Sequence, residues 1–443
     1  MKNDSLLIKN ARIIGPAAGI EETCDILITG GKISKTGKNI SAAGVTVINA
    51  SGLIASPGFI DLHCHLRQPG YENKETIATG ARAAACGGYT TICCMPNTNP
   101  PLDSAAVVSH VRDIAAREAS FITILPVGCI TEGRAGKELT NMAELAATGC
   151  IGFSDDGSTV SNNRIMSLAM DNAAVLDLPI IDHCEDVDLS QGGHMNEGWV
   201  AVRLGLKGIP AAAEDTIVAR DIALCERTGA KLHLTHISTA GSVQLVRDAK
   251  CRGLKVTCDV TPHHLTLTHE RVMNSQDDPR SSLAYDTNAR VNPPLRSPAD
   301  VEALIRGITD GTIDVIATDH APHTIEEKLC EFENAVSGII GFETAFGVLM
   351  SLVHTGKISL NALLTCLTTG PASILKNGAG TLNPGARADL TLLDTGYEWT
   401  VDAKEFFSKG RNTPFDGCKL KGMVVATISG GFLAFRHNSL RID

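Results

Sequence analysis

Short apolar runs alternate with helix-like segments rich in Ala, Leu and Glu through the middle of the chain. Eight runs have the length of a strand, at residues 58–65, 89–95, 121–128, 149–155, 179–184, 231–237, 255–260 and 313–320. Continuous apolar runs between helical segments are typical of a parallel sheet that helices cover on both faces. Eight such units predict a (β/α)8 barrel of the TIM type over residues 57–379.

Both ends of the chain have a different pattern, with short alternating strands and Gly or Asn turns. The first stretch contains LLIKNARII and CDILITGGKIS, and the last contains ADLTLLD and GMVVATISGGFLAFR. A turn such as Gly30-Gly31 between alternating apolar runs indicates a hairpin. We therefore predict an α/β fold with a small β-sandwich domain formed from residues 1–56 and 380–443, since domain termini often lie close together.

Composition narrows the function classes. The 443 residues, 43% of them hydrophobic, suffice for a large barrel with a satellite domain. A net charge of −10 argues against a nucleic-acid surface. No apolar run reaches membrane-spanning length, and Met1–Asn10 lacks a secretory core, so we expect a cytoplasmic protein that binds neither nucleic acid nor membrane.

The 14 cysteines form no C-x-x-C pair, and most lie inside apolar runs. Without a secretory signal, we predict that they are reduced and buried as small hydrophobic residues. Side chains alternate between the two faces of a strand, so Cys64 should point outward if His63 and His65 point inward.

Polar side chains end strand after strand of the predicted barrel. They are His63 and His65 on the first strand, Asp155 on the fourth, His183 on the fifth, His236 on the sixth and Asp319 on the eighth. The carboxyl ends of barrel strands meet at one mouth, where active sites lie. Imidazole and carboxylate ligands without thiolates favour zinc, and also fit manganese, cobalt or iron. Any one of these residues alone could be a hydrogen-bonded core residue, but six together indicate a metal centre.

A set of motifs in fixed order gives this chain a family resemblance. It contains PGFIDLHCHLRQPG, MPNTNP, FSDDG, HCED, THIST, VTPHHL, NPPLR, ATDHAPH and GFETAF, which span about residues 57–346. With these motifs the chain resembles the dihydroorotases of the amidohydrolase superfamily, in the bacterial type I group. Spacing alone would indicate only a barrel metallohydrolase.

The resemblance implies a role for each metal ligand. His63, His65 and Asp319 would hold one zinc ion and His183 and His236 a second, with Asp155 as the bridge. Hydantoinases, allantoinases and type II dihydroorotases are similar but bridge their metals with a carboxylated lysine. The fourth strand here ends GFSDDG, without a lysine, which favours type I dihydroorotase. The choice of Asp155 over Asp156 rests on the family pattern.

The implied reaction is the reversible, zinc-dependent cyclisation of N-carbamoyl-L-aspartate to L-dihydroorotate and water in pyrimidine biosynthesis. Asp319 is the expected catalytic residue, carrying a proton between the nucleophile and the leaving nitrogen. The resemblance leaves open a homodimer and a complex with aspartate carbamoyltransferase.

The substrate carries a carboxylate, for which Arg67 offers a planar bidentate fork. A surface ion pair at Arg67 and a turn-supporting role for Asn97 are the structural alternatives. The predicted substrate contacts are His65, Arg67, Asn97, Asn292, His323, Ser337 and Gly338.

The charged stretch His323–Gly338 follows the catalytic strand and is either a solvated helix or a lid over the substrate. Relatives often carry a bulky Phe where this chain has Ser337. Two other functions stay open: a hydantoinase-type or allantoinase-type cyclic amidase, and a non-catalytic homologue that scaffolds aspartate carbamoyltransferase. Retention of every metal-binding histidine argues against pure scaffolding.

Overall fold

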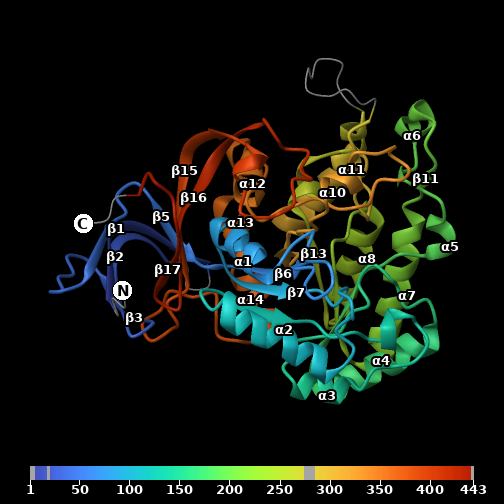
Figure 1. Ribbon diagram of the computed structural model, residues 1–443, viewed down its shortest axis with the longest axis horizontal. Helices are drawn as coiled ribbons and strands as arrows, with labels where there is room; N and C mark the ends of the chain where they lie inside the picture. The colour runs from blue at the N-terminus through green and yellow to red at the C-terminus, as the bar shows by residue number, and fades with distance from the viewer. Residues whose placement is uncertain (1–4, 17–19, 274–284, 441–443) are drawn as a thin grey trace.

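A closed barrel of parallel strands forms the centre of the structure (Figure 1). The computed structural model describes residues 5–16, 20–273 and 285–440. Two hydrogen-bonded sheets, of three and four strands, supply the barrel wall. Their strands are β6 (Phe59–Cys64), β7 (Tyr89–Cys94), β8 (Thr123–Pro126), β9 (Pro179–Asp182), β12 (Lys231–Leu234), β13 (Val256–Val260) and β14 (Val315–Ile316).

The fourth predicted strand, residues 149–155, lies in the wall but forms no regular ladder. Its Phe153 makes single parallel bridges to Gly128 on one side and Ile180 on the other. The barrel closes between β14 and β6 through the bridge from Cys64 to His320. The predicted α/β barrel is therefore confirmed, with one irregular wall segment between β8 and β9.

Helices follow the strands and cover the outside of the barrel (Figure 1). The larger ones are α1 (Ile77–Cys86), α2 (Ala105–Glu118), α3 (Met142–Ala147), α4 (Asn163–Leu176), α7 (Ala212–Thr228), α8 (Ala240–Cys251), α10 (Pro298–Thr309), α12 (Ala345–His354), α13 (Leu360–Leu367) and α14 (Thr369–Leu375). Their starts follow the capping rules: Ser297 and Asp300 form a capping box at α10, with Pro298 in the first turn.

Shorter elements lie in the loops that connect these strands and helices. They are α5 (Val187–Ser190), β10 (Met195–Asn196), α6 (Trp199–Leu204), β11 (Gly208–Ile209), α9 (Pro262–Thr266) and α11 (Ile325–Lys328), with 3-10 turns at Glu132–Arg134, His269–Val272, Thr287–Ala289 and Ala403–Glu405. None of the helices in the described part of the chain is long and apolar enough to cross a membrane.

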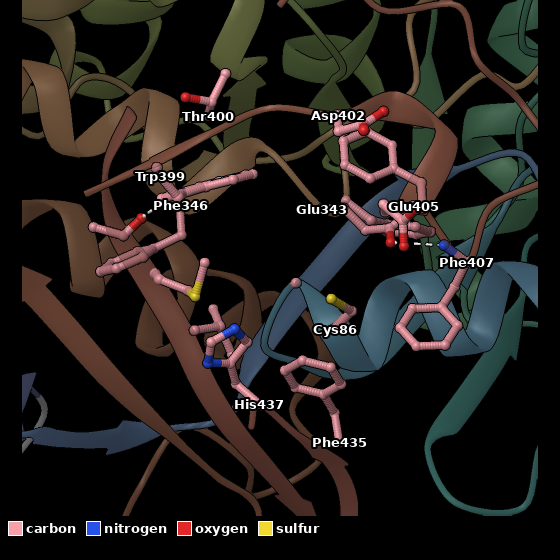
Figure 2. Close-up of a pocket in the computed structure, with 17 residues that line it drawn as sticks. Cys86, Glu343, Phe346, Trp399, Thr400, Asp402, Glu405, Phe407, Phe435 and His437 are labelled. Atoms are coloured by element: carbon pink, nitrogen blue, oxygen red, sulfur yellow. Dashed lines mark hydrogen bonds between the residues drawn. The ribbon is translucent and has the colours of Figure 1, made fainter. Parts of the chain in front are cut away.

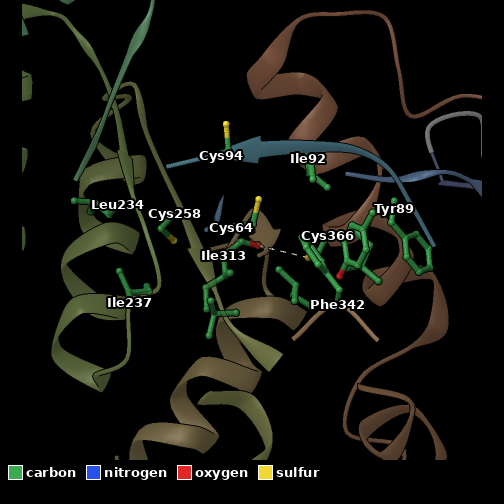
Figure 3. Packing of buried hydrophobic residues seen from close by; sticks show 14 of the residues in the cluster. Cys64, Tyr89, Ile92, Cys94, Leu234, Ile237, Cys258, Ile313, Phe342 and Cys366 are labelled. Atoms are coloured by element: carbon green, nitrogen blue, oxygen red, sulfur yellow. Dashed lines mark hydrogen bonds between the residues drawn. The ribbon is translucent and has the colours of Figure 1, made fainter. Parts of the chain in front are cut away.

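Two layers of apolar side chains pack the barrel. Ile60, Leu62 and Cys93 belong to the inner cluster, whereas Cys64 and Cys94 lie in the outer cluster between strands and helices. Figure 3 shows the outer layer, with Cys64, Cys94, Cys258 and Cys366 among aliphatic and aromatic neighbours. All 14 cysteines are free, and the predicted burial is confirmed for ten of them, whereas Cys251 is exposed. The outward direction predicted for Cys64 is confirmed by its place in the outer cluster.

Strands from both chain ends share one eight-stranded sheet at the side of the barrel, blue and red in Figure 1. The sheet contains β1 (Ser5–Gly15), β2 (Ile20–Thr29), β3 (Lys32–Gly37), β4 (Thr46–Asn49), β5 (Ile54–Pro57), β15 (Leu390–Thr400), β16 (Lys419–Ser429) and β17 (Phe432–Arg436). β5 joins the two ends, pairing parallel with β1 and antiparallel with β15. The sheet surrounds its own apolar core, which includes Ile8, Ile26 and Leu392. The domain boundaries at residues 57 and 380 stay a prediction.

Candidate metal centre and substrate site

Six polar side chains from the ends of five wall segments meet at the barrel mouth. His63 is on β6 and His65 follows it. Asp156 follows the irregular segment, and His183 follows β9. His236 and Asp319 lie just beyond β12 and β14. All six are nearly buried, with at most 7% of the residue exposed.

The distances divide these side chains into two groups. Nε2 of His65 lies 2.9 Å from Oδ1 of Asp319 and 3.3 Å from Nε2 of His63. Nδ1 of His183 lies 2.9 Å from Nε2 of His236. The first group offers three ligand atoms within 4.8 Å of one another.

Asp156 lies between the two groups. Its Oδ1 is 3.4 Å from Nε2 of His63, 3.7 Å from Nε2 of His236 and 3.8 Å from Nδ1 of His183. Its Oδ2 is 3.7 Å from Nε2 of His65. One carboxylate thus faces all four imidazoles, as a bridge between two metal ions requires.

The structure corrects the assignment of Asp155 as the bridge. Oδ1 of Asp155 accepts hydrogen bonds from the backbone amides of Ile130 at 2.9 Å and Thr131 at 3.1 Å, and Oδ2 accepts one from the Thr131 hydroxyl. Asp155 therefore fixes the loop after β8. Neighbouring side chains on an extended segment point to opposite sides, so Asp156 faces the mouth.

Three of the four imidazoles make a hydrogen bond on the side that faces away from the centre, and this bond fixes the tautomer of the ring. The Thr235 hydroxyl is 2.9 Å from Oδ2 of Asp259, which can only accept, and 2.5 Å from Nδ1 of His63. Because the hydroxyl donates its hydrogen to Asp259, Nδ1 of His63 carries a hydrogen and Nε2 presents a lone pair to the centre. Nδ1 of His65 lies 2.9 Å from Oδ1 of Asn97, an acceptor, so its Nε2 also presents a lone pair.

The ring of His183 has the opposite tautomer. Its Nε2 lies 3.1 Å from Oε2 of Glu185, so this nitrogen carries the hydrogen and Nδ1 faces the centre. Nδ1 of His236 makes no hydrogen bond to the described residues, and its Nε2 faces Asp156. The four rings are oriented as neutral metal ligands are in proteins, with an outer hydrogen bond on three of them.

The charges of the centre fit a cation. Burial disfavours a charged His63, yet the carboxylates of Asp156 and Asp319 raise its pKa to about 10. The same histidines hold the pKa of Asp156 well below its usual range, against the effect of burial. Oδ1 of Asp156 is buried and accepts no hydrogen bond from the described residues. The residues present therefore suit divalent metal ions bound between histidines and carboxylates.

Two buried aspartates hold the backbone from which the ligands project. Asp61 accepts from the amides of Thr318 and His63 and from the Thr318 hydroxyl, at 2.5 to 3.2 Å. Asp259 accepts from the amide of His236 at 2.7 Å. His236 and Asp319 have positive φ values of 38° and 46°, which non-glycine residues rarely adopt. These strained residues lie at the centre, and the hydrogen bonds to Asp61 and Asp259 stabilise the backbone around them.

Arg67 and His323 lie together beside the centre. Nε of Arg67 donates to the carbonyl oxygen of Pro322 at 3.2 Å, and Nη2 lies 3.2 Å from Nε2 of His323. Nε2 of His323 is 2.9 Å from the carbonyl oxygen of Ser337. The structure thus brings three of the predicted substrate contacts together.

The two asparagines predicted to contact substrate also make hydrogen bonds to other side chains of the site, and their substrate contact stays a prediction. Asn97 accepts from His65 and donates to Oδ2 of Asp156 at 3.2 Å, so it links two metal ligands. Asn292 donates through Nδ2 to Oε2 of Glu185 at 2.8 Å.

Gly338 packs tightly against the last strand's loop. A Cβ there would come within 2.9 Å of Ala321, and the residue's φ is 144°. Its amide donates to the carbonyl oxygen of Arg290, and its own carbonyl oxygen accepts from Nδ2 of Asn412 at 3.0 Å. Substrate contact through Ser337 or Gly338 stays a prediction.

The charged stretch after β14 is anchored at Lys328, although several of its residues, including Glu326 and Glu333, are exposed. Only residues 325–328 form a helix, and the buried Lys328 donates to the carbonyl oxygens of Thr287, Arg290 and Val336. Burial lowers the pKa of Lys328 to about 7.

Several residues of this site were not predicted from the sequence. Asp156, Asp61 and Thr235 lie within two residues of predicted ligands in the sequence. Asp259 lies inside β13, and Glu185 belongs to the HCED motif. Asn412 comes from the C-terminal part of the chain and accepts from the amide of His323 at 3.0 Å. For Asp156, the adjacent FSDDG pair was the available signal.

A third cluster of side chains of the metal-ligand type is paired with a positively charged arginine. Asp182, Cys184 and Asp221 lie close together behind β9. The guanidinium of Arg220 is 2.8 Å from Oδ1 of Asp221 and 3.6 Å from Oδ2 of Asp182. This cluster is therefore an ion-paired part of the wall.

An apolar cavity of about 240 Å³ lies away from the metal centre, against the split sheet (Figure 2). Phe346, Trp399 and Phe435 line it together with Cys86 and Glu343. None of the predicted site residues lines this cavity. The polar mouth of the barrel therefore remains the candidate active site.

We expect low pH to destabilise the folded chain through His323. Burial lowers the pKa of His323 to about 2, and the charges of Arg67 and Lys328 act in the same direction. The unfolded chain, with an ordinary pKa near 6.5, binds a proton that the folded chain excludes, so stability falls as pH drops below about 6.5. Between pH 7 and pH 5 this group should cost about 2 kcal/mol.

His323→Gln should remove that loss, which urea unfolding of both metal-free proteins at pH 7 and pH 5 measures. His354→Gln, on an exposed part of α12, is the control and should leave the wild-type pH dependence intact. An equal loss in wild type and His323→Gln would contradict the prediction.

Comparison with solved structures defines the class. The chain is similar to a dihydropyrimidinase from Brevibacillus agri NCHU1002, with a TM-score of 0.83, 22% identity and coverage of 98% of this chain and 95% of that one. A D-hydantoinase from a Thermus species has a TM-score of 0.79 at 25% identity, with 97% and 95% covered. These likenesses show that the chain shares the fold of these cyclic amide hydrolases.

Sequence comparison names the family. The family model described as Dihydro-orotase-like matches residues 52–242. A dihydroorotase of Pelotomaculum thermopropionicum is 48% identical over 437 residues, covering 98% of this chain and all of the relative. One from Caldanaerobacter subterraneus subsp. tengcongensis is 49% identical, with 98% of each covered. The chain belongs to the dihydroorotase family.

Proposed function

We propose that this chain catalyses the reversible cyclisation of N-carbamoyl-L-aspartate to L-dihydroorotate and water. The observation that carries the proposal is the likeness over nearly the full length to curated dihydroorotases. Hydantoinases share the fold and are the alternative. The segment that supplies Asp156 contains no lysine, which favours a dihydroorotase of type I.

The proposed cofactor is zinc, with two ions in each chain. His63, His65 and Asp319 would hold one ion, His183 and His236 the other, and Asp156 would bridge them. The close approach of the four imidazoles and the unpartnered oxygen of Asp156 support this arrangement. Zinc bound there would polarise the ring carbonyl and lower the pKa of water towards about 7.

Asp319 is the proposed proton carrier. Burial opposes its charge, but the imidazoles of His65 and His63 beside it hold the pKa of Asp319 below its usual range, so the carboxylate is ionised and can accept a proton. In hydrolysis it would take the proton of the attacking water and deliver it to the leaving ring nitrogen. In cyclisation the same carboxylate would remove a proton from the ureido nitrogen.

Arg67 and His323 are proposed to bind the exocyclic carboxylate of the substrate. The guanidinium supplies charge and a planar pair of donors, and the ring of His323 lies 3.2 Å from it with its single N–H directed to Ser337. Pro322 and Ser337 hold the two side chains in place through their carbonyl oxygens.

The test of the function is a comparison of substrates on purified protein with measured zinc content. We expect hydrolysis of L-dihydroorotate, and formation of dihydroorotate from N-carbamoyl-L-aspartate, at rates far above those with hydantoin and allantoin. Preference for hydantoin or allantoin would overturn the proposal. A complex with aspartate carbamoyltransferase stays a prediction, which co-elution of the two proteins tests.

Arg67→Ala should raise KM for dihydroorotate about 100-fold with a smaller change in kcat. A charge-assisted hydrogen-bond pair contributes about 3 kcal/mol, and each 1.4 kcal/mol is a factor of ten. Steady-state kinetics measure the split between KM and kcat. Arg117→Ala, in an exposed ion pair with Glu118, is the control and should change neither constant. An unchanged KM in Arg67→Ala would place the carboxylate elsewhere.

A further inference from the structure

Glu185 contacts one metal ligand and one predicted substrate contact at the same time. Its Oε2 accepts from Nε2 of His183 at 3.1 Å and from Nδ2 of Asn292 at 2.8 Å. The two donors come from different wall segments, because His183 follows β9 and Asn292 lies beyond β13. One carboxylate oxygen therefore couples the metal centre to the substrate side of the mouth.

The position of Glu185 is itself fixed by its neighbours. Its amide donates to the Thr159 hydroxyl at 3.2 Å, and that hydroxyl donates to the carbonyl oxygen of His183 at 2.6 Å. The Glu185 side chain is 21% exposed, so it lies at the rim of the centre and not in the core. A loop held in this way presents the carboxylate in one place.

The carboxylate determines which way the Asn292 amide is turned. A carboxylate oxygen only accepts, so the group 2.8 Å from it must be the N–H₂ end of the amide. The opposite orientation would bring two oxygens together at that distance. Oδ1 of Asn292 therefore faces away from Glu185, and it accepts no hydrogen bond from residues 5–16, 20–273 or 285–440.

The same oxygen orients the ring of His183. With Nε2 donating to Glu185, Nδ1 points into the centre, 3.8 Å from Oδ1 of Asp156. An outer carboxylate on a metal-binding histidine fixes its tautomer and strengthens it as a ligand.

We propose that Glu185 is a positioning residue that aims His183 at the second metal ion and makes Asn292 a hydrogen-bond acceptor for a ring N–H of the substrate. This inference rests on the proposed function and adds to it. The site then selects cyclic amides by an N–H group, because an N-alkylated ring leaves Oδ1 of Asn292 unpaired. A site built around such a hydrogen bond rejects the analogue that lacks it by about 100-fold or more.

The first test uses zinc alone and needs no turnover. Metal-depleted wild type and Glu185→Ala are titrated with zinc against a chromophoric chelator. We expect two binding events in wild type, and in the variant a weakening of one event by about 10- to 100-fold with the other unchanged. Two unchanged affinities would overturn the role at His183.

The second test compares L-dihydroorotate with its 1-methyl and 3-methyl derivatives. Wild type should discriminate against one of the two methylated rings by about 100-fold in kcat/KM. Glu185→Ala should lose at least about tenfold of that discrimination, because Asn292 can then turn its N–H₂ end to the ring. Discrimination that is the same in both proteins would overturn the role at Asn292.

Two further variants separate positioning from loop stability. Glu185→Gln keeps an acceptor oxygen, so it should restore most of the lost zinc affinity and discrimination. Asp186→Ala removes the neighbouring carboxylate, which caps α5 by accepting from the amides of Asp188 and Leu189. It should lower thermal stability without moving either readout, and a loss equal to that of Glu185→Ala would overturn the proposal.

The proposed function and this inference fail in different ways. Wild type that binds two zinc ions but does not turn over dihydroorotate would overturn the function. The zinc titration of Glu185→Ala would then still decide whether Glu185 aims His183.

Discussion

Asp156→Asn is expected to lower kcat for dihydroorotate by about a thousandfold or more and to reduce bound zinc from two ions to one or none. An amide has one acceptor oxygen and no charge, so it cannot join two cations as a carboxylate does. The several kcal/mol of charge stabilisation that a catalytic metal supplies is then lost. Kinetics and elemental analysis on the same preparation measure both effects.

Asp155→Asn is the matched control for Asp156→Asn. It changes the adjacent residue in the same way but affects hydrogen bonds from Ile130 and Thr131. We expect a loss of about 1 to 3 kcal/mol in stability, with zinc content and kcat of the folded protein retained. If Asp155→Asn lost zinc and Asp156→Asn kept it, Asp155 would be the bridge after all.

Asp319→Asn is expected to lower kcat by about 10² to 10⁴ in both directions of the reaction, because the proton carrier is gone. The amide oxygen can still face His65, so the fold and much of the zinc content should survive. Kinetics in the two directions, with circular dichroism and metal analysis, test this expectation.

Asp310→Asn serves as the control for Asp319→Asn. Asp310 is an exposed carboxylate that pairs with Arg247 outside the barrel mouth. It should leave kcat within about twofold, since exposed ion pairs contribute at most about 1 kcal/mol. Near-normal turnover by Asp319→Asn would remove Asp319 from the proton-transfer step.

The sequence predicted the barrel well because its wall strands are short apolar runs that end in ligand-type residues. His63, His65, His183, His236 and Asp319 all follow such runs, and the structure brings them together. Because side chains alternate between the two faces of a strand, the sequence also predicted correctly that Cys64 lies in the outer layer.

The fourth segment shows where that reasoning reached its limit. Residues 149–155 make single bridges instead of a ladder, so no register connects them to their neighbours. Asp155 and Asp156 are both buried carboxylates in one motif. Only the three-dimensional position of Thr131 reveals that Asp155 is already saturated with donors.

The supporting residues could not be predicted for a related reason. Asp61 and Asp259 lie inside apolar strand runs, where they resemble interruptions of the pattern. Asn412 is 89 residues from His323, whose amide it accepts. Such contacts depend on how distant segments pack, and the hydrophobic pattern of a single helix or strand does not predict them.

The sheet shared by the two chain ends has a consequence for synthesis on the ribosome. β5 leaves the ribosome early, but its antiparallel neighbour β15 follows more than 300 residues later. Until then the nascent chain presents an open strand edge with unpaired amides and carbonyls, which is a site for association with other chains. Completion of this sheet is therefore a late, long-range event, which follows the synthesis of all the barrel strands.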